Sequence, residues 1–286
     1  MESIKSEITI YLSLKASEIY LVHESLQISR VMRSNGVHMQ HEDEDIDPTK
    51  VFLSDQMPST AHASQAPKIN NYLIQSIASS IHIRELPHRG LSFQLWPAAA
   101  TLFTLLDSHK SRPTEGPLTP LFARSQPLNI LEIGSGTGLV GITAAVILRA
   151  NVTVTDLPNV VENLQYNVEA NADVLTANNG VVRATALRWG VVSDAEALGR
   201  EYDLVLGSDL VYHEHLYEPL LRTLEWFLCA EKEMVFVMSH LKRWKKEGAF
   251  FKKARKLFNV SILHSAEPID GFRVGVLVYQ FNKRST

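Results

Sequence analysis

The sequence predicts an α/β fold with a mostly parallel sheet, helices on both of its faces and an antiparallel hairpin near the C-terminus. Three observations predict it: an apolar run that leads into a glycine-rich loop, a β-branched run after the next helical stretch, and two late apolar runs separated by turn residues. Strand-like runs alternating with helical spacing are typical of βαβ units.

The glycine-rich loop lies in 128–141, where an apolar strand is followed by Gly134, Gly136 and Gly138 and then by an apolar helical stretch. Glycines at alternate positions allow positive φ and let a ligand approach the main chain closely. A loop of this kind between a strand and a helix predicts a nucleotide-like cofactor.

Two cofactor classes use such a loop. Residues 136–141 fit the dinucleotide fingerprint, in which a pyrophosphate lies on the helix N-terminus. Glu132, two residues before the first glycine, would repel a pyrophosphate but suits a cation. S-adenosylmethionine carries a sulfonium and an ammonium and no phosphate, so the sequence favours a methyltransferase over a dehydrogenase.

The second strand, Asn151–Asp156, is rich in β-branched residues and ends in a carboxylate. Asp156 follows Glu132 by 24 residues (156 − 132), about the separation of roughly 20 at which an acid binds ribose hydroxyls. The alternative is an ordinary turn or N-cap aspartate before Leu157 and Pro158. We favour the ribose role.

Residues 202–212 predict a fourth strand whose tip carries Asp209 and Tyr212. Ligands of open parallel sheets bind at the carboxyl ends of strands, so these two residues are the best catalytic candidates. The alternative is a capping aspartate followed by a buried tyrosine. Trp96, just before a helix beginning at Pro97, fits a core position and a ligand-facing one equally well. Trp189, after the third strand, fits equally well a contact with an adenine and a packing role.

Composition bounds the class of protein. The chain has 286 residues, a mass of 32.0 kDa and a formal charge of −3, which predicts one large α/β domain with an appendage and no general attraction to nucleic acid or membrane. A single cysteine, Cys229, excludes an internal disulfide, and its apolar neighbours predict a core position. With no apolar run that suits a membrane span or a signal peptide, we expect a cytosolic protein and leave a nuclear location open.

The domain prediction is an N-terminal extension over 1–67, with a mobile acidic linker over about 38–67, followed by the catalytic domain over 68–286. Further predicted elements are a pair of short strands in 72–83, a loop over 108–126, and helices over 97–107, 160–170, 215–229 and 241–258. The last helix is amphipathic and rich in lysine, and a solvated lysine face is favoured there over a docking surface.

Several motifs together resemble the class I, seven-strand methyltransferases, and within them the methyltransferase-like 21 group of lysine methyltransferase family 16. The resemblance covers roughly 72–282, and its motifs are Leu95–Ala99, Leu131–Gly138, Thr155–Pro158 with Asn163, Leu164 and Asn167, Trp189–Gly190 and Asp209–Tyr212. It implies a Rossmann-like fold with a mostly parallel seven-strand sheet and S-adenosyl-L-methionine as cofactor.

The resemblance also implies roles for single residues. Glu132, Gly134 and Gly136 would line the methionine part of the cofactor, Asp156 the ribose and Leu157 the adenine edge. Trp96, Trp189, Ser208 and the loop residue Ser135 would complete the pocket, and Asp209 and Tyr212 would face the incoming amine. The implied partner is a protein substrate such as a chaperone or ATPase. We expect the protein to be a monomer that binds neither membranes nor a specific nucleic acid.

Other functions stay open. The runner-up is a class I methyltransferase that acts on a small molecule or an RNA nitrogen, although the sequence lacks the aromatic and basic surface of single-stranded RNA readers. A nicotinamide oxidoreductase is less favoured, because the Tyr-x-x-x-Lys match at 11–15 precedes the glycine loop. A non-catalytic interaction protein is disfavoured by the acids at the strand tips. We expect no metal, since His213 and His215 lack a third ligand at suitable spacing.

Overall fold

A computed structural model describes residues 66–122, 127–268 and 275–284. The predictions made for the extension and the acidic linker concern residues that lie almost wholly outside these ranges. Apart from 267–268 and 275, the described residues belong to one compact unit, Thr60–Ala266 with Val276–Thr286.

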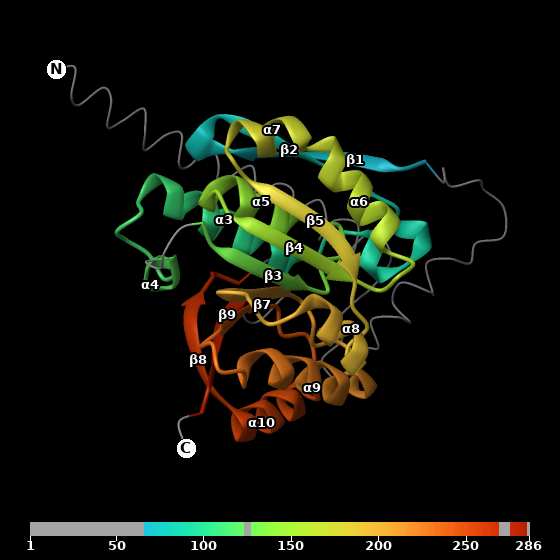
Figure 1. The fold of residues 1–286 in the computed structure, drawn as a ribbon, viewed down its shortest axis with the longest axis vertical. Helices are drawn as coiled ribbons and strands as arrows, with labels where there is room; N and C mark the ends of the chain where they lie inside the picture. Colours follow the sequence, from blue (N-terminus) through green and yellow to red (C-terminus); the bar gives the residue numbers. More distant parts are fainter. Residues whose placement is uncertain (1–65, 123–126, 269–274, 285–286) are drawn as a thin grey trace. The chain divides into compact units, whose positions relative to one another are not determined.

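Seven strands of the described chain form one sheet in the order β5-β4-β3-β6-β7-β9-β8 (Figure 1). Their bounds are β3 Asn129–Ile133, β4 Asn151–Asp156, β5 Val181–Ala186, β6 Leu204–Ser208, β7 Val235–His240, β8 Phe258–Ser265 and β9 Leu277–Lys283. Strands β3, β4, β5, β6 and β7 are parallel to one another, and β9 pairs antiparallel with β7 and β8. The predicted sheet and its C-terminal hairpin are confirmed.

Helices cover both faces of this sheet (Figure 1). One face carries α3 Pro97–Ser111, α4 Thr119–Phe122, α5 Leu139–Leu148, α6 Val161–Ala170 and α7 Ala172–Ala177; the other carries α8 Val192–Leu198, α9 Tyr217–Leu228 and α10 Glu247–Leu257. Successive strand residues point to opposite faces. Leu204 accordingly packs in the first apolar cluster and Val205 in the second, so the strands are buried on both sides.

A second, two-stranded sheet pairs β1 Lys68–Ile74 with β2 Ser79–Glu85, which confirms the predicted pair of short strands. Asparagine side chains of α6, and of the residue that follows α6, form hydrogen bonds with the backbone along one edge of β2. Asn171 Oδ1 accepts from the His82 amide at 2.8 Å and its Nδ2 donates to the His82 carbonyl at 2.8 Å. Asn167 repeats this pattern with Arg84, at 2.8 and 3.1 Å.

These side chains therefore replace a neighbouring strand for β2. Asn167 also donates to the Thr137 carbonyl at 2.9 Å, so the same amide joins the hairpin to the glycine loop. Asn163 and Asn167 are fully buried. Their common partner in β2, Arg84, lies 79 and 83 residues away along the chain.

Three local predictions were wrong. The basic helix predicted from Leu241 begins only at Glu247, because the amides of Leu241 and Arg243 donate to carboxylates of Asp209 and Glu247. Cys229 is exposed, since it follows the end of α9. The loop predicted over 108–126 contains the end of α3 and all of α4.

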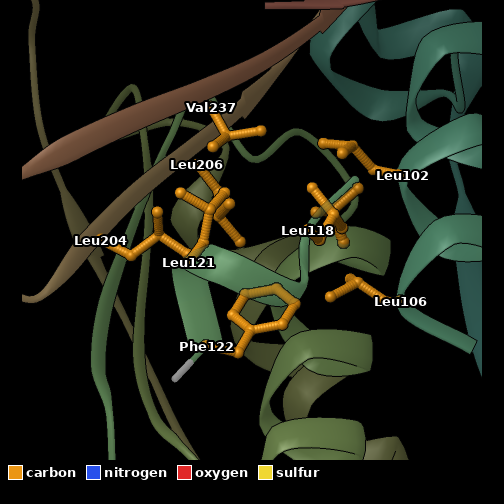
Figure 2. Close-up of a pocket in the computed structure, with 9 residues that line it drawn as sticks. Leu102, Leu106, Leu118, Leu121, Phe122, Leu204, Leu206 and Val237 are labelled. Atoms are coloured by element: carbon orange, nitrogen blue, oxygen red, sulfur yellow. The ribbon is translucent and has the colours of Figure 1, made fainter. Parts of the chain in front are cut away.

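Below α4 the core leaves a small apolar cavity (Figure 2). It is lined by aliphatic and aromatic side chains from α3, α5, the sheet, and α4 with the residue before it: Leu102, Leu106, Leu118, Leu121, Phe122, Val140, Leu204, Leu206 and Val237. Ligand sites combine apolar walls with a few polar groups that fix orientation. This lining has no polar side chain, so we interpret the cavity as a packing gap.

Candidate functional site

The glycine loop between β3 and α5 depends on positive φ at Gly134, Gly136 and Gly138. Close packing constrains it as well: a Cβ on Gly134 would lie 2.8 Å from Cζ2 of Trp189 and 2.7 Å from Leu210. The loop therefore brings Trp189, predicted from the sequence as an adenine wall, against the first glycine.

Glu132 lies beneath the loop and is almost completely buried. Its Oε2 accepts from the amide of Gly141, the third residue of α5, at 3.0 Å. Burial raises the pKa of Glu132 to about 8, although hydrogen bonds from Ser135 and Gly141 act in the opposite direction. The first turn of α5, where a dinucleotide places its pyrophosphate, thus already holds a carboxylate of the protein.

Asp156 ends β4 beside the loop. Its Oδ2 accepts from the Gly136 amide at 2.8 Å and its Oδ1 from the Leu157 amide at 2.8 Å. Burial raises its pKa, opposed by these bonds and by one from the side chain of Ser92. Ser92 was not recognised from the sequence, and its carbonyl lies 3.2 Å from where a Cβ on Gly136 would be, so the turn at 91–93 covers the loop.

The other predicted cofactor residues differ in their surroundings. Ser135 is tied into β4, since its hydroxyl accepts from the Thr155 amide at 3.0 Å. Trp96 is half-buried before α3, and its indole donates to the Leu91 carbonyl at 3.0 Å. Leu157 is 47% exposed, and Ser208, the last residue of β6, is half-buried.

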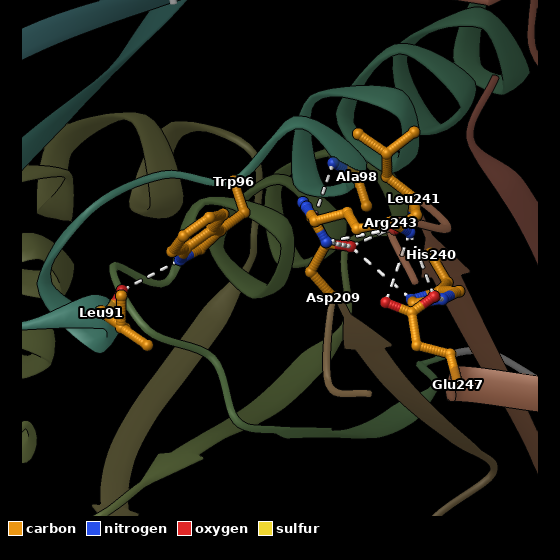
Figure 3. Close-up of polar contacts among 8 residues, drawn as sticks. All are labelled: Leu91, Trp96, Ala98, Asp209, His240, Leu241, Arg243 and Glu247. Carbon is orange, nitrogen blue, oxygen red and sulfur yellow. Dashed lines mark hydrogen bonds and ion pairs between the residues drawn. The ribbon is translucent and has the colours of Figure 1, made fainter. Parts of the chain in front are cut away.

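Asp209 is the centre of a buried polar cluster at the tip of β6 (Figure 3). Its two oxygens accept from both terminal nitrogens of Arg243, at 3.0 and 2.9 Å, and from the amides of Leu241 and Ala98, at 3.0 and 3.3 Å. Burial alone would raise its pKa, but the charge and hydrogen bonds of Arg243 hold the pKa below its ordinary value. Asp209 also has a positive φ of 52°.

The polar cluster around Asp209 also includes His240 and Glu247. His240 Nδ1 lies 3.7 Å from Asp209 Oδ1, and its Nε2 lies 3.0 Å from Oε2 of the buried Glu247. The guanidinium carbon of Arg243 stands 5.3 Å from the centre of the Trp96 ring. Arg243 and His240 were not predicted from the sequence, although His240 ends β7, the parallel neighbour of β6, and Arg243 follows three residues later.

Tyr212 is half-buried three residues beyond Asp209. Burial raises the pKa of its hydroxyl to about 12, and the charge of Asp156 contributes in the same direction. The hydroxyl therefore feels the carboxylate at the tip of β4, which means that the predicted ribose and amine ends of the site share one region.

The donor set fits a cationic nucleoside cofactor better than a dinucleotide. Neither Glu132 nor Asp156 forms a salt bridge with a described residue, so two neighbouring strand tips carry carboxylates without a protein cation. A sulfonium or ammonium would compensate them, and hydroxyl groups could bond to Asp156. The fold and the site thus define an α/β domain of the nucleoside-cofactor class, with a glycine loop and two buried strand-tip carboxyl groups.

Comparison with known proteins makes the assignment specific. The chain belongs to the lysine methyltransferase family, whose model matches residues 75–257. It is 33% identical over 175 residues to the protein N-lysine methyltransferase METTL21A of Danio rerio, covering 61% of this chain and 72% of that protein. METTL21A of Mus musculus is 36% identical, with coverage of 54% and 66%.

A third relative, EEF1A lysine methyltransferase 3 of Xenopus tropicalis, is 38% identical over 40% of this chain and 47% of its own. The matches to these three relatives thus span from 47% to 72% of the relatives' own length. Among solved structures, an S-adenosylmethionine-dependent methyltransferase from Agrobacterium tumefaciens covers 78% of this chain and 72% of its own at 14% identity and a TM-score of 0.45, too low a similarity to inform function.

The family assignment confirms the resemblance predicted from the sequence and its cofactor class, S-adenosylmethionine. In the part of the chain that the structure describes, no helix is long and apolar enough to cross a membrane. The same residues contain no group of three or more histidine, cysteine, aspartate or glutamate side chains suited to a metal ion.

Proposed function

We propose that this protein is an S-adenosylmethionine-dependent protein-lysine N-methyltransferase. The observation that carries the proposal is the pair of buried carboxylates on adjacent strand tips, together with the bond from Gly141 to Glu132 that fills the anion position of α5. This arrangement opposes a pyrophosphate and favours a cation. The family assignment then points to lysine as the acceptor.

The cofactor-binding residues follow the predicted set. Asp156 bonds the ribose hydroxyls, the loop at Gly134 and Gly136 lines the methionine part, and Leu157 with Trp189 flanks the adenine. Glu132 acts from beneath the loop through its hold on α5, and a bound cation would favour its charged form. When bound, S-adenosylmethionine supplies an electrophilic methyl group.

The acceptor lysine must lose a proton before its nitrogen can attack. A lysine with a pKa of about 10.4 needs about 4 to 5 kcal/mol to be neutral at pH 7, at about 1.36 kcal/mol per pH unit. A positive charge beside the amine lowers this cost, as does removal of the amine from water. Because the pKa of Tyr212 is raised to about 12, its hydroxyl stays neutral and its oxygen can accept a bond from the amine and orient the lone pair.

The proposed role of Asp209 follows from its contacts. The sequence analysis named Asp209 as a catalytic candidate that would face the incoming amine. Its oxygens already accept from Arg243 and from two backbone amides, and its pKa is lowered, which is unsuitable for a proton acceptor at neutral pH. We therefore propose Asp209 as a positioning residue that fixes the backbone leading to Tyr212, with the proton passing to water.

The substrate and setting are narrower proposals. We propose a protein acceptor; a chaperone, an ATPase, and the EEF1A that is named for one relative are the first candidates to test. We further propose a monomer that works in the cytosol, with the nucleus as a second location to examine. The runner-up acceptor is a small molecule or an RNA nitrogen.

Calorimetric titration tests the cofactor. We expect the wild-type protein to bind S-adenosylmethionine and not NAD, and Asp156→Asn to weaken that binding. Labelling of a cell lysate with a radioactive methyl donor, followed by hydrolysis and detection of methyllysine, tests the acceptor. Tyr212→Phe should keep cofactor binding and lose most of the transfer. Binding of NAD would overturn the cofactor assignment, and label found in RNA would support the runner-up.

A further inference from the structure

The turn that covers the glycine loop is held on both sides of Ser92. Before Ser92, the Leu91 carbonyl accepts a hydrogen bond from the Trp96 indole at 3.0 Å (Figure 3). After it, the Phe93 carbonyl accepts from the Leu86 amide at 2.8 Å. The position of Ser92 is therefore fixed by contacts that do not use its own hydroxyl.

Apolar packing holds the same turn. The buried ring of Phe93 forms a small cluster with Leu86 and Val160. Val160 is the N-cap residue of α6 and lies in the connection that follows Asp156, the last residue of β4. The turn thus packs against the chain segment that leads away from the carboxylate of the predicted ribose site.

Ser92 contacts both Asp156 and the glycine loop. Its carbonyl lies 3.2 Å from the point where a Cβ on Gly136 would be. The Gly136 amide donates to Asp156 at 2.8 Å. The Ser92 hydroxyl donates to the same carboxylate and favours its ionised form. Ser92 is therefore a neighbour of the ribose carboxylate through its side chain and of the loop through its backbone.

The bonds that Asp156 already accepts limit what it can offer a sugar. A carboxylate has about four lone-pair sites. The amides of Gly136 and Leu157 and the hydroxyl of Ser92 take up three of these sites. A ribose presents a pair of neighbouring hydroxyl donors, so one of the pair finds no free site on Asp156. Ser92 has this capacity, because a serine hydroxyl that donates one bond keeps about two lone pairs.

We propose that Ser92 shares the ribose hydroxyls of S-adenosylmethionine with Asp156 and accepts one of them itself. The serine hydroxyl donates to the carboxylate and accepts from the sugar, so the two side chains act together as one set of acceptors. A deoxyribose leaves one acceptor of this set without its donor, which makes Ser92 a residue that selects ribose over deoxyribose. The inference rests on the proposed function and names a further residue of its cofactor site.

The structural alternative is that the Ser92 hydroxyl only holds the turn or the carboxylate in place. The two explanations differ in a measurable way. Loss of a purely structural bond weakens the binding of ribose and deoxyribose ligands by the same factor. Loss of a bond to the sugar weakens the ribose ligand alone and removes the discrimination.

Calorimetric titration distinguishes these cases. The ligands are S-adenosylhomocysteine, its 2′-deoxy analogue and its 3′-deoxy analogue. Ser92→Ala removes the hydroxyl, and Ser92→Thr keeps it. The matched control is Ser79→Ala, because Ser79 is also half-buried and its hydroxyl donates to the Ile77 carbonyl at 3.5 Å, within the hairpin.

We expect the wild type to bind each deoxy analogue about tenfold more weakly than S-adenosylhomocysteine. Ser92→Ala should melt as the wild type does and bind S-adenosylhomocysteine about three- to tenfold more weakly. One of the deoxy analogues should then bind to Ser92→Ala within about twofold of S-adenosylhomocysteine. Ser92→Thr and Ser79→Ala should keep the discrimination of the wild type against both analogues.

Three results would overturn the inference and leave the proposed function intact: loss of folding in Ser92→Ala, an unchanged affinity of this variant for S-adenosylhomocysteine, or an equal loss for all three ligands. Each of them assigns the hydroxyl to the fold. If no form of the protein binds S-adenosylhomocysteine, the cofactor assignment and this inference fail together.

Discussion

Replacing Asn167 by alanine should destabilise the protein far more than a typical polar substitution. Asn167 is fully buried, and its amide serves the Arg84 amide, the Arg84 carbonyl and the Thr137 carbonyl. The Arg84 carbonyl keeps a bond from Asn163 in the variant, at 3.3 Å. Two buried backbone groups lose their partner, each at about 1 to 3 kcal/mol, which gives about 4 kcal/mol in total.

Denaturant unfolding and thermal melting measure this loss. A change of about 4 kcal/mol corresponds to a fall in Tm of about 8 to 16 °C for a domain of this size. Because Thr137 belongs to the glycine loop, the affinity for S-adenosylmethionine should fall as well. The matched control is Asn178→Ala, since Asn178 is half-buried at the end of α7 and its side-chain amide donates to the carbonyl of Val174 in that helix. A loss below about 1 kcal/mol, or one equal to that of the control, would refute the reasoning.

The remaining predictions concern the site. Gly141→Ala should lower Tm and abolish cofactor binding, because its Cβ would meet Val154 Cγ1 at 2.3 Å and Glu132 Oε2 at 2.6 Å, whereas Gly248→Ala meets nothing within 4 Å and should be harmless in the same assays. Burial raises the pKa of Glu132 to about 8, so its contribution to stability is fully present below the unfolded pKa and is lost as pH rises to about 8. Tm of the cofactor-free protein should therefore fall between pH 5 and 8 and level off above that, and Glu132→Gln should flatten this dependence. A profile that is equally steep in the variant would assign the pH dependence to other groups. Arg243→Ala should cost about 3 to 5 kcal/mol in chemical denaturation, because it leaves the carboxylate of Asp209 buried without its cation, and Arg243→Lys should recover part of this; equal losses in the two variants would contradict the ion-pair explanation.

Local patterns predicted the strands, the glycine loop and the strand-tip acids. Each of these depends on residues that are close along the chain, such as the apolar run that ends at Glu132 or the β-branched run that ends at Asp156. The roles of Asp209 and Tyr212 remain predictions. Their position at the same sheet edge as Asp156 could be expected, because parallel strands end at one edge of a sheet.

The errors and omissions come from contacts between distant residues. The start of α10 depends on Asp209, which takes the amide of Leu241 from 32 residues away. The bond of Ser92 to Asp156 and the pairing of Arg243 with Asp209 likewise join segments that no local pattern relates. Cys229 was misplaced because apolar neighbours indicate a buried helix but not where that helix ends.

The asparagine side chains can bond to the edge of β2 because the spacing of residues along a helix nearly matches the spacing along a strand. Four residues of α-helix rise about 6.0 Å and two residues of strand about 6.8 Å, so every fourth helical side chain can face every second strand residue, with a mismatch of about 0.8 Å per step. Asn171 and Asn167 match His82 and Arg84 in this way. Asn163 no longer reaches Leu86, whose amide bonds to Phe93 instead, and it turns back to Arg84.

The geometry thus limits such a ladder to two full rungs here. Two rungs are enough to occupy the backbone groups of β2 at His82 and Arg84 and to close that edge to any strand from another chain, without the cost of a bulge or an inward-pointing charge. A helix with amides every fourth residue is therefore a compact device against edge-to-edge aggregation, and it can be transferred to designed hairpins that pack against a helix.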